Sequence, residues 1–263
     1  MAGHPLPRPT ILINTTIKIF AHRGSSLIWP ENTMLAFDKA HTAGATGFET
    51  DLRLSKDEEI VLSHDDNLAR FGLPQATVSS LKAADICRLE ISSRNDKYRD
   101  RMIRLRELLE KYPEKDYIFD CKISDRRLFA RLQDLLSGIS PDHSIWFLAW
   151  SRTADRHLRV FFPNHQIFPR VSRTTVWGWG SILGVGRILE PRNQVLALPA
   201  YNIGIPVFRK SQVSSIKKRR KTFLAYLANS DKDFRRCVWA GVDSILTDRP
   251  DLLESFCRKQ RLR

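Results

Sequence analysis

The stretch Ile17-Lys18-Ile19-Phe20-Ala21-His22-Arg23-Gly24 joins an apolar run to a polar turn. Its first five residues are typical of a buried strand, and Gly24 permits a tight turn directly after it. Residues 32–43 then follow helical spacing, and Asn32 or Thr33 can cap that helix. His22 and Arg23 therefore lie at the carboxyl end of a predicted strand, which is where β/α-barrel enzymes build their active sites.

The same alternation of strand and helix continues along the chain. Later strands are predicted at residues 47–54, with a short extension at 59–62, and at 117–123, 145–150, 166–171, 195–200, 223–228 and 244–247, and another helix around 105–112. This alternation indicates a parallel sheet, and 263 residues suit the roughly 250 of a barrel. We predict an α/β protein with a single-domain TIM (β/α)8 barrel at residues 17–263, after an N-terminal extension at 1–16.

The chain is basic, with 43 Lys and Arg against 29 Asp and Glu and a net charge of +14. This balance favours anionic partners, such as phosphorylated substrates, membrane surfaces or nucleic acid. The four cysteines have neither CxxC nor metal-finger spacing, which indicates reduced thiols. The first 19 residues lack the apolar core of a signal peptide, and no apolar stretch is long enough to span a bilayer. We expect a cytoplasmic protein.

Two acids on the second predicted strand, Glu49 and Asp51, are spaced for a shared site. Side chains two residues apart on a strand point to the same face. Buried carboxylates are costly unless they are paired or bind a cation, and Mg²⁺ and Ca²⁺ prefer such oxygen ligands. The alternative is a pair of charges near solvent that Arg53 or Lys56 neutralises.

Further polar residues stand at the ends of the neighbouring strands. Ser63-His64-Asp65 closes the extension of the second strand. Asp120 and Lys122 repeat the two-residue spacing on the next strand, where the acid can complete a carboxylate trio and the lysine can neutralise a phosphate. This convergence at the ends of successive strands indicates a catalytic site.

With these residues in view, the chain resembles the glycerophosphodiester phosphodiesterase family. The matching motifs are His22-Arg23-Gly24, Pro30-Glu31-Asn32-Thr33, Ala36-Phe37, Gly44-Ala45, Glu49-x-Asp51, Lys56-Asp57, Val61, His64-Asp65, Leu68-x-Arg70 and Gly241-Val242-Asp243-Ser244-Ile245-Leu246-Thr247-Asp248-Arg249-Pro250. The match is dense over residues 17–70, sparse in the middle and good again over residues 237–253.

The resemblance implies a TIM-barrel phosphodiesterase that hydrolyses glycerophosphodiesters to glycerol phosphate and an alcohol with one divalent cation, Mg²⁺ or Ca²⁺. The site residues that it implies are the metal ligands Glu49, Asp51 and Asp120, the acid/base pair His22 and His64, and the phosphate-binding Arg23 and Lys122. Histidine suits proton transfer because its pKa lies near neutrality. The cationic groups would offset the charge that repels a nucleophile.

Three features depart from the family pattern. Asp120-x-Lys122 replaces the usual Glu-x-Lys, and it is similar to the related spider-venom-type phospholipase D enzymes, so a lysophospholipase D activity is an alternative. Tyr226 stands where the family often has a substrate-binding tryptophan. Residues 66–102 lack the usual Arg-Thr-Thr continuation of a segment that normally helps form the substrate pocket.

The sequence also bears on three other classes of protein, namely a non-catalytic barrel, a dinucleotide-binding protein and a nucleic-acid-binding protein. A catalytically weak phosphate-binding barrel is a further alternative. The glycines of residues 178–184 have the wrong spacing for a dinucleotide-binding turn. The basic run at residues 217–221 is typical of a solvated helix end, so we expect no nucleic acid partner.

A last segment, residues 176–186, is apolar and rich in glycine, and it carries Trp177 and Trp179. We predict a βα loop here on the active-site face. Tryptophan favours the bilayer interface, and basic side chains attract anionic lipid, so the loop predicts peripheral contact with an anionic membrane. The alternative is a lid that packs over the barrel mouth.

Overall fold

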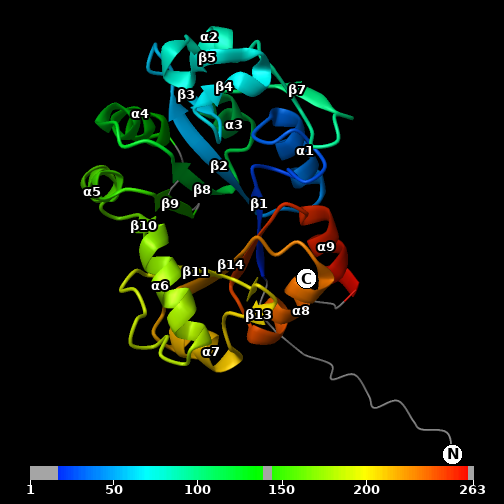
Figure 1. Cartoon of the computed structure of the whole chain (residues 1–263), viewed down its shortest axis with the longest axis vertical. Coiled ribbons are helices and arrows are strands. Elements are labelled where there is room, and N and C mark those ends of the chain that lie inside the picture. The colour runs from blue at the N-terminus through cyan, green and yellow to red at the C-terminus, as the bar shows by residue number, and fades with distance from the viewer. Residues whose placement is uncertain (1–16, 139–143, 260–263) are drawn as a thin grey trace, which may run out of the picture.

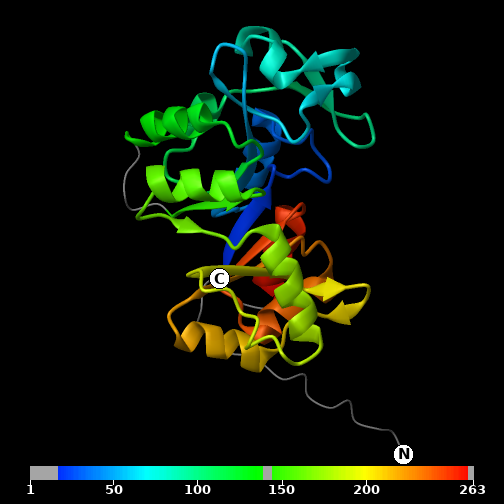
Figure 2. The ribbon, with the colours of Figure 1, turned by 60° about the vertical axis from the view of Figure 1, so that its left-hand side comes forward.

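The computed structural model describes residues 17–138 and 144–259, so the predicted extension at residues 1–16 lies outside the described residues. Eight parallel strands follow one another in the order β10-β9-β8-β2-β1-β15-β14-β11 and curve into a barrel (Figure 1, Figure 2). Their bounds are β1 (Lys18–His22), β2 (Gly47–Leu54), β8 (Asp116–Cys121), β9 (Ile145–Ala149), β10 (Gln166–Ile167), β11 (Val195–Pro199), β14 (Thr222–Tyr226) and β15 (Ser244–Thr247). The predicted TIM-barrel fold is confirmed.

The barrel is nearly closed. Within the described residues no ladder joins β10 to β11, so these two strands form the edges of a seam. Helix α6 (Val171–Ile182) packs against β11 beside this seam, where Gly178 faces the side chain of Leu198.

Helices cover the outside of the sheet, and apolar side chains fill both sides of it. The other long helices are α1 (Met34–Thr42), α3 (Leu105–Lys111), α4 (Arg126–Leu136), α5 (Arg152–Phe161), α7 (Lys210–Lys218), α8 (Asp231–Ala240) and α9 (Pro250–Lys259). Inside the barrel, Phe20, Ile118 and Leu224 belong to one buried cluster. The residues two positions further along the same strands are His22, Asp120 and Tyr226. Strand alternation therefore raises the polar residues directly above an apolar floor.

An insertion separates β2 from α3. It contains β3 (Ile60–Leu62), which pairs with β2 in the antiparallel sense, and two small two-stranded sheets, β4 (Asn67–Leu68) with β5 (Leu73–Thr77) and β6 (Glu90–Ser92) with β7 (Arg99–Arg101). Short helices η1 (Ala69–Phe71), η2 (Val78–Ser80) and α2 (Ala83–Ile86) complete it. Figure 1 shows it as the cyan cap at the top of the molecule. The insertion packs on its own small apolar cluster, which includes Val61, Val78 and Met102.

The structure corrects the prediction for residues 176–186. Most of this segment is helical, because α6 extends from Val171 to Ile182. Trp177 is completely buried, whereas Trp179 is 47% exposed. Gly178 and Gly180 reflect close packing of the helix, since a Cβ at Gly180 would lie 2.5 Å from the side chain of Leu189. The segment is therefore neither a loop nor a pair of exposed tryptophans.

The predicted strand at residues 166–171 is also too long. The observed strand β10 has only Gln166 and Ile167, and α6 begins at Val171. Pro169 stands between the two elements and lacks the N–H that a longer ladder would use.

Candidate active site

A pocket of about 300 Å³ opens at the carboxyl ends of the barrel strands. The predicted site residues that line it are His22, Arg23, Glu49, His64, Asp120, Lys122 and Tyr226. Asp51 lies next to them and is completely buried. Among the described residues of the insertion, His64 alone contributes to this lining. The fold thus gathers all eight predicted side chains in or beside one pocket.

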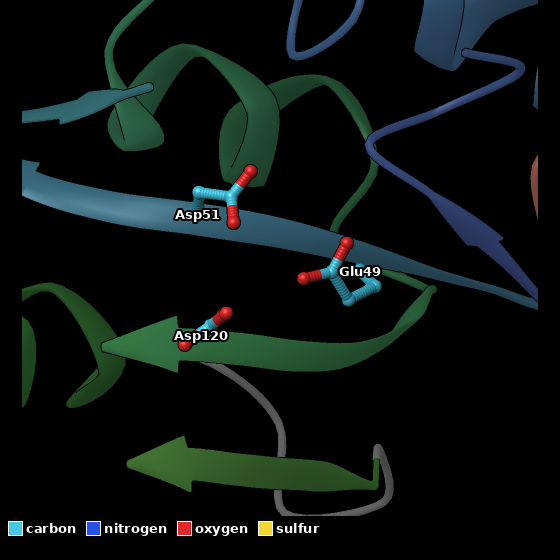
Figure 3. A group of neighbouring side chains, drawn as sticks. All are labelled: Glu49, Asp51 and Asp120. Carbon is cyan, nitrogen blue, oxygen red and sulfur yellow. The ribbon is translucent and has the colours of Figure 1, made fainter. Parts of the chain in front are cut away.

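Three carboxylates meet at the polar rim of the pocket. Glu49 and Asp51 project from β2, and Asp120 projects from the neighbouring β8, as Figure 3 shows. One oxygen from each residue lies within 4.8 Å of the others, and all three residues are buried. The alternative pairing with Arg53 or Lys56 is wrong, because Arg53 donates to the backbone oxygen of His64 and both acids lie away from solvent.

Burial and mutual repulsion make this carboxylate group costly without a cation. Burial raises the pKa of Glu49 to about 8, and the neighbouring Asp51 and Asp120 add to the effect. Burial also raises the pKa of Asp120. Within the described residues, Asp51 Oδ1 is buried without a hydrogen bond, although Lys122 Nζ lies 3.0 Å away. A hard divalent cation fits this donor set, because carboxylate oxygens are its preferred ligands.

Two basic side chains border the carboxylates. Lys122 Nζ lies 3.0 Å from Asp51 Oδ1 and 2.5 Å from Asp120 Oδ2, and Arg23 Nε lies 3.0 Å from Asp51 Oδ2. Burial works to raise the pKa of Asp51, but Arg23 and Lys122 outweigh it and lower that pKa. Arg23 and Lys122 therefore favour the ionised form of Asp51, and both basic side chains also line the pocket.

His22 makes a close pair with a carboxylate from the far end of the chain. Its Nδ1 lies 2.6 Å from Asp248 Oδ1, and its Nε2 lies 3.7 Å from Glu49 Oε2. Because a carboxylate accepts only, Nδ1 carries the proton and Nε2 faces the acidic site. Burial works to raise the pKa of Asp248, but hydrogen bonds from His22, Ser26 and Asn229 outweigh it and lower that pKa to about 2.

His64 has the same arrangement elsewhere in the pocket lining. Its Nδ1 lies 2.8 Å from Asp65 Oδ1, and the side chain is 38% exposed. Burial works to raise the pKa of Asp65, but the interaction with His64 lowers it. Both pocket histidines therefore have a carboxylate on Nδ1 and leave Nε2 available.

The turn after β1 fixes these groups in place. Glu31 accepts hydrogen bonds from Arg23 and Arg70, each through one guanidinium nitrogen. Asn32 donates to Asp51 Oδ2 at 2.8 Å and accepts from Thr50. Thr33 caps α1, because its hydroxyl oxygen accepts a hydrogen bond from the backbone N–H of Ala36. The turn therefore orients Arg23 and Asp51 and also caps α1.

Aromatic side chains form the wall of the pocket. Trp150 donates from Nε1 to Asp120 Oδ1 at 2.7 Å, and its ring lies 4.9 Å from Lys122 Nζ. Tyr226 lies on the other side, at the end of β14. The wall therefore contacts the acidic site on one side and the apolar barrel interior on the other.

Sequence reasoning missed four residues of this site: Asp65, Asp248, Asn32 as a partner of Asp51, and Trp150. Asp65 follows a candidate histidine, and Asp248 directly follows the last barrel strand. Their positions at the carboxyl ends of strands were the signals that could have identified them. Nothing in the spacing identifies their partners, since His22 and Asp248 are 226 residues apart.

Comparisons with known proteins identify the family of the chain. Residues 22–252 match the sequence profile of the Glycerophosphoryl diester phosphodiesterase family. The glycerophosphodiester phosphodiesterase of Caldanaerobacter subterraneus subsp. tengcongensis is 26% identical over 246 residues, which cover 92% of this chain and 98% of that protein. Human lysophospholipase D GDPD1 is 29% identical over 269 residues, which cover 91% of this chain and 85% of that protein.

A solved structure shares the fold. The Oleispira antarctica phosphodiesterase in complex with the product sn-glycerol-3-phosphate has a TM-score of 0.69 at 20% identity, over 92% of this chain and 96% of that one.

Proposed function

Because the chain belongs to the glycerophosphoryl diester phosphodiesterase family and is a phosphoric diester hydrolase, we propose that it cleaves glycerophosphodiesters to glycerol phosphate and an alcohol. The observation that carries this proposal is one site that combines three buried carboxylates with two histidines, each hydrogen-bonded to a carboxylate. The basic side chains of Arg23 and Lys122 line the same pocket. A phosphodiester needs charge neutralisation and proton transfer, and this set of groups supplies both.

Glu49, Asp51 and Asp120 would hold one divalent cation, Mg²⁺ or Ca²⁺. When bound, such a cation polarises a phosphoryl oxygen and stabilises negative charge. Arg23 and Lys122 reinforce that effect from the pocket wall, because each places a fixed positive charge beside the carboxylates. Tyr226 contributes an aromatic surface against which the alcohol group packs.

His22 and His64 would share the proton transfers. The Nε2 of one histidine takes a proton from the nucleophile, which is water or a neighbouring hydroxyl of the substrate. The Nε2 of the other gives a proton to the departing alkoxide. Asp248 and Asp65 hold the two rings in the tautomer that these roles require.

A second substrate class is favoured by the apolar part of the pocket. Below the polar rim, its lining is aliphatic and aromatic and comprises Ile118, Leu148, Phe168, Ala197, Leu224 and Leu246. An acyl chain would gain free energy by burial there. A lysophospholipid is therefore a second candidate substrate.

Two further proposals concern domain organisation and location. We propose a single barrel domain at residues 17–263 with residues 1–16 as an extension. The four free cysteines support a cytoplasmic location, and the basic net charge supports peripheral contact with an anionic membrane. Across the described residues, no helix is long and apolar enough to cross a bilayer.

A substrate panel tests the proposal. Release of glycerol phosphate is measured from glycerophosphodiesters, and release of lysophosphatidic acid is measured from lysophospholipids. Each assay is run with and without a chelator. We expect turnover that excess chelator abolishes and that Mg²⁺ or Ca²⁺ restores. Full turnover in excess chelator would contradict the metal-dependent mechanism, and phosphate binding without turnover would indicate a catalytically weak barrel.

A melting experiment tests the cation site without turnover. Mg²⁺ or Ca²⁺ should raise the melting temperature of the wild-type protein, because the cation binds only the folded trio. Asp120→Asn should remove that increase. Asp116→Asn is the matched control, since Asp116 is a buried acid at the other end of the same strand, paired with Lys18. An equal loss in both variants would argue against a cation at the trio.

A further inference from the structure

Positive charge is concentrated in one sector of the barrel. Residues 156–230 run from within α5 to the residue before α8. They contain thirteen Lys and Arg but a single acid, Glu190. This sector therefore carries +12 of the net charge of +14. The rest of the chain is nearly neutral, so the basic character belongs to one side of the molecule.

The same sector exposes large apolar side chains. Val176 and Trp179 of α6 and its C-cap residue Leu183 follow helical spacing, and all three are exposed. Beside them, the hairpin of β12 (Tyr201–Asn202) and β13 (Ile205–Pro206) exposes Ile203 and Ile205. A run of exposed apolar residues of this kind marks an interaction site more often than chance exposure.

A hollow lies between the end of α6, the hairpin and α8 (Asp231–Ala240). Ile182 of α6, Ile205 of the hairpin, and Trp239 of α8 line it together with the basic residues Arg209 and Lys210. Figure 2 shows α6 and the yellow hairpin in the lower half of the molecule, and the end of α6 shares the hollow with the hairpin. Apolar and basic groups therefore share one continuous face.

The active-site pocket is linked to this face through a single helix. The first turns of α6 line the pocket with Val171, Thr174 and Thr175. Its last turn borders the hollow with Ile182. A partner held against the face would thus contact the same helix that lines the pocket.

We propose that Val176, Trp179, Leu183, Ile203, Ile205 and Trp239, with Arg209 and Lys210, form a docking surface for an anionic lipid bilayer. The proposal deepens the proposed function, because it places a source of lipid substrate beside the pocket. Charge complementarity assigns the partner: the sector is strongly basic, and the aliphatic and indole groups between the cations suit the headgroup and acyl boundary. Nucleic acid would use the charge but not the isoleucine and leucine side chains.

Vesicle co-sedimentation tests the docking surface directly and needs no turnover. The protein should bind vesicles of phosphatidylserine and phosphatidylcholine at low salt and should bind phosphatidylcholine alone more weakly. Trp179→Ser and Ile205→Ser should each weaken binding by about fivefold or more, because each removes apolar burial. Arg209→Glu should weaken it by at least about fivefold, and salt should reduce binding of the wild-type protein.

Matched controls lie outside the sector or the face. Val160→Ser changes a valine of α5 that is 65% exposed, and Arg94→Glu reverses an exposed charge in the insertion; both variants should bind like the wild-type protein. The proposal is overturned if anionic vesicles do not bind, or if the controls lose as much binding as the surface variants. It is also overturned if Trp179→Ser changes only the oligomeric state, since the face would then join copies of the chain. Turnover of a soluble glycerophosphodiester by Trp179→Ser should stay unchanged, which separates docking from catalysis.

Discussion

His22 and His64 differ in surroundings but share one hydrogen-bond arrangement. Each ring donates from Nδ1 to a carboxylate, so Nε2 is left for proton transfer. Burial works to lower the pKa of His22, yet Glu49 and Asp248 outweigh it and raise that pKa. His64, which also lines the pocket, is more exposed. Two histidines in unequal environments suit opposite roles in one reaction.

Removing either imidazole should lower turnover sharply. We expect His22→Ala and His64→Ala each to reduce kcat by about 10²-fold or more, the usual scale for an acid or base. His41→Ala, on the exposed face of α1, is the control and should leave kcat unchanged. Steady-state kinetics with melting temperatures measures both effects. A variant with near-normal turnover would exclude that histidine from the mechanism.

Asp248 should act as a positioning residue for His22. Asp248→Asn keeps the shape of the side chain but removes the charge, so kcat should fall by at least about tenfold with little change in KM. Nitrogen chemical shifts of His22 should reveal a larger share of the tautomer protonated at Nε2. A purely structural role predicts instead a lower melting temperature with an unchanged tautomer, and that result would exclude the positioning role.

The sequence could predict which polar residues meet but not how they pair. Glu49, Asp51, Asp120 and Lys122 follow from strand alternation at known edges, a rule that acts over two residues. The Asp248 partner of His22 depends on how β1 pairs with β15, which residue spacing does not contain. Trp150 was overlooked for the same reason, because its partner Asp120 belongs to the neighbouring strand.

Among the elements, strands with buried faces were the most predictable. The bounds of β2 and β15 agree with prediction, since unbroken buried runs end at clear turns. Helix α6 was mistaken for a loop because glycine weakens a helical signal. Here the glycines serve packing: Gly178 lies against β11, and Gly180 leaves room for Leu189. Such contacts arise only after folding.

The turn between β1 and α1 should depend on Gly24. Its φ is +82°, and a Cβ there would lie 2.7 Å from the backbone of Ala36. Gly24→Ala therefore combines backbone strain with a clash, and we expect it to lower the free energy of unfolding by about 3 kcal/mol or more. Gly72→Ala is the matched control, because Gly72 has a φ of +77° but open space at Cβ. It should cost only about 1 kcal/mol.

Urea denaturation measures both glycine variants. The difference between them isolates the close approach of the turn to α1, since the backbone strain is nearly equal. Equal losses of stability would show that the turn relaxes around the new methyl group. In that case the loop that carries Arg23 would be less rigid than the structure indicates.

At the scale of the whole molecule, the barrel is uneven. The strands on one side, from β8 through β2 to β1, pair in continuous ladders and carry the carboxylates. The other side has the seam between β10 and β11, the basic sector and the exposed face of α6. Rigid support for the cation site and an adaptable wall for the substrate thus lie on opposite sides of one pocket.

Hydrogen exchange should reveal this asymmetry. Strand edges without a ladder partner open at lower free energy than paired central strands, so amides of β10 and α6 should exchange faster than those of β2 and β8 by roughly an order of magnitude or more. Saturating glycerol 3-phosphate should slow exchange at Val171, Thr174 and Thr175, which line the pocket, and leave α4 unchanged, because no residue of α4 lines it. Exchange at β10 and α6 as slow as at β2 would mean that side-chain packing closes the seam as firmly as a ladder, and the substrate wall would then be rigid.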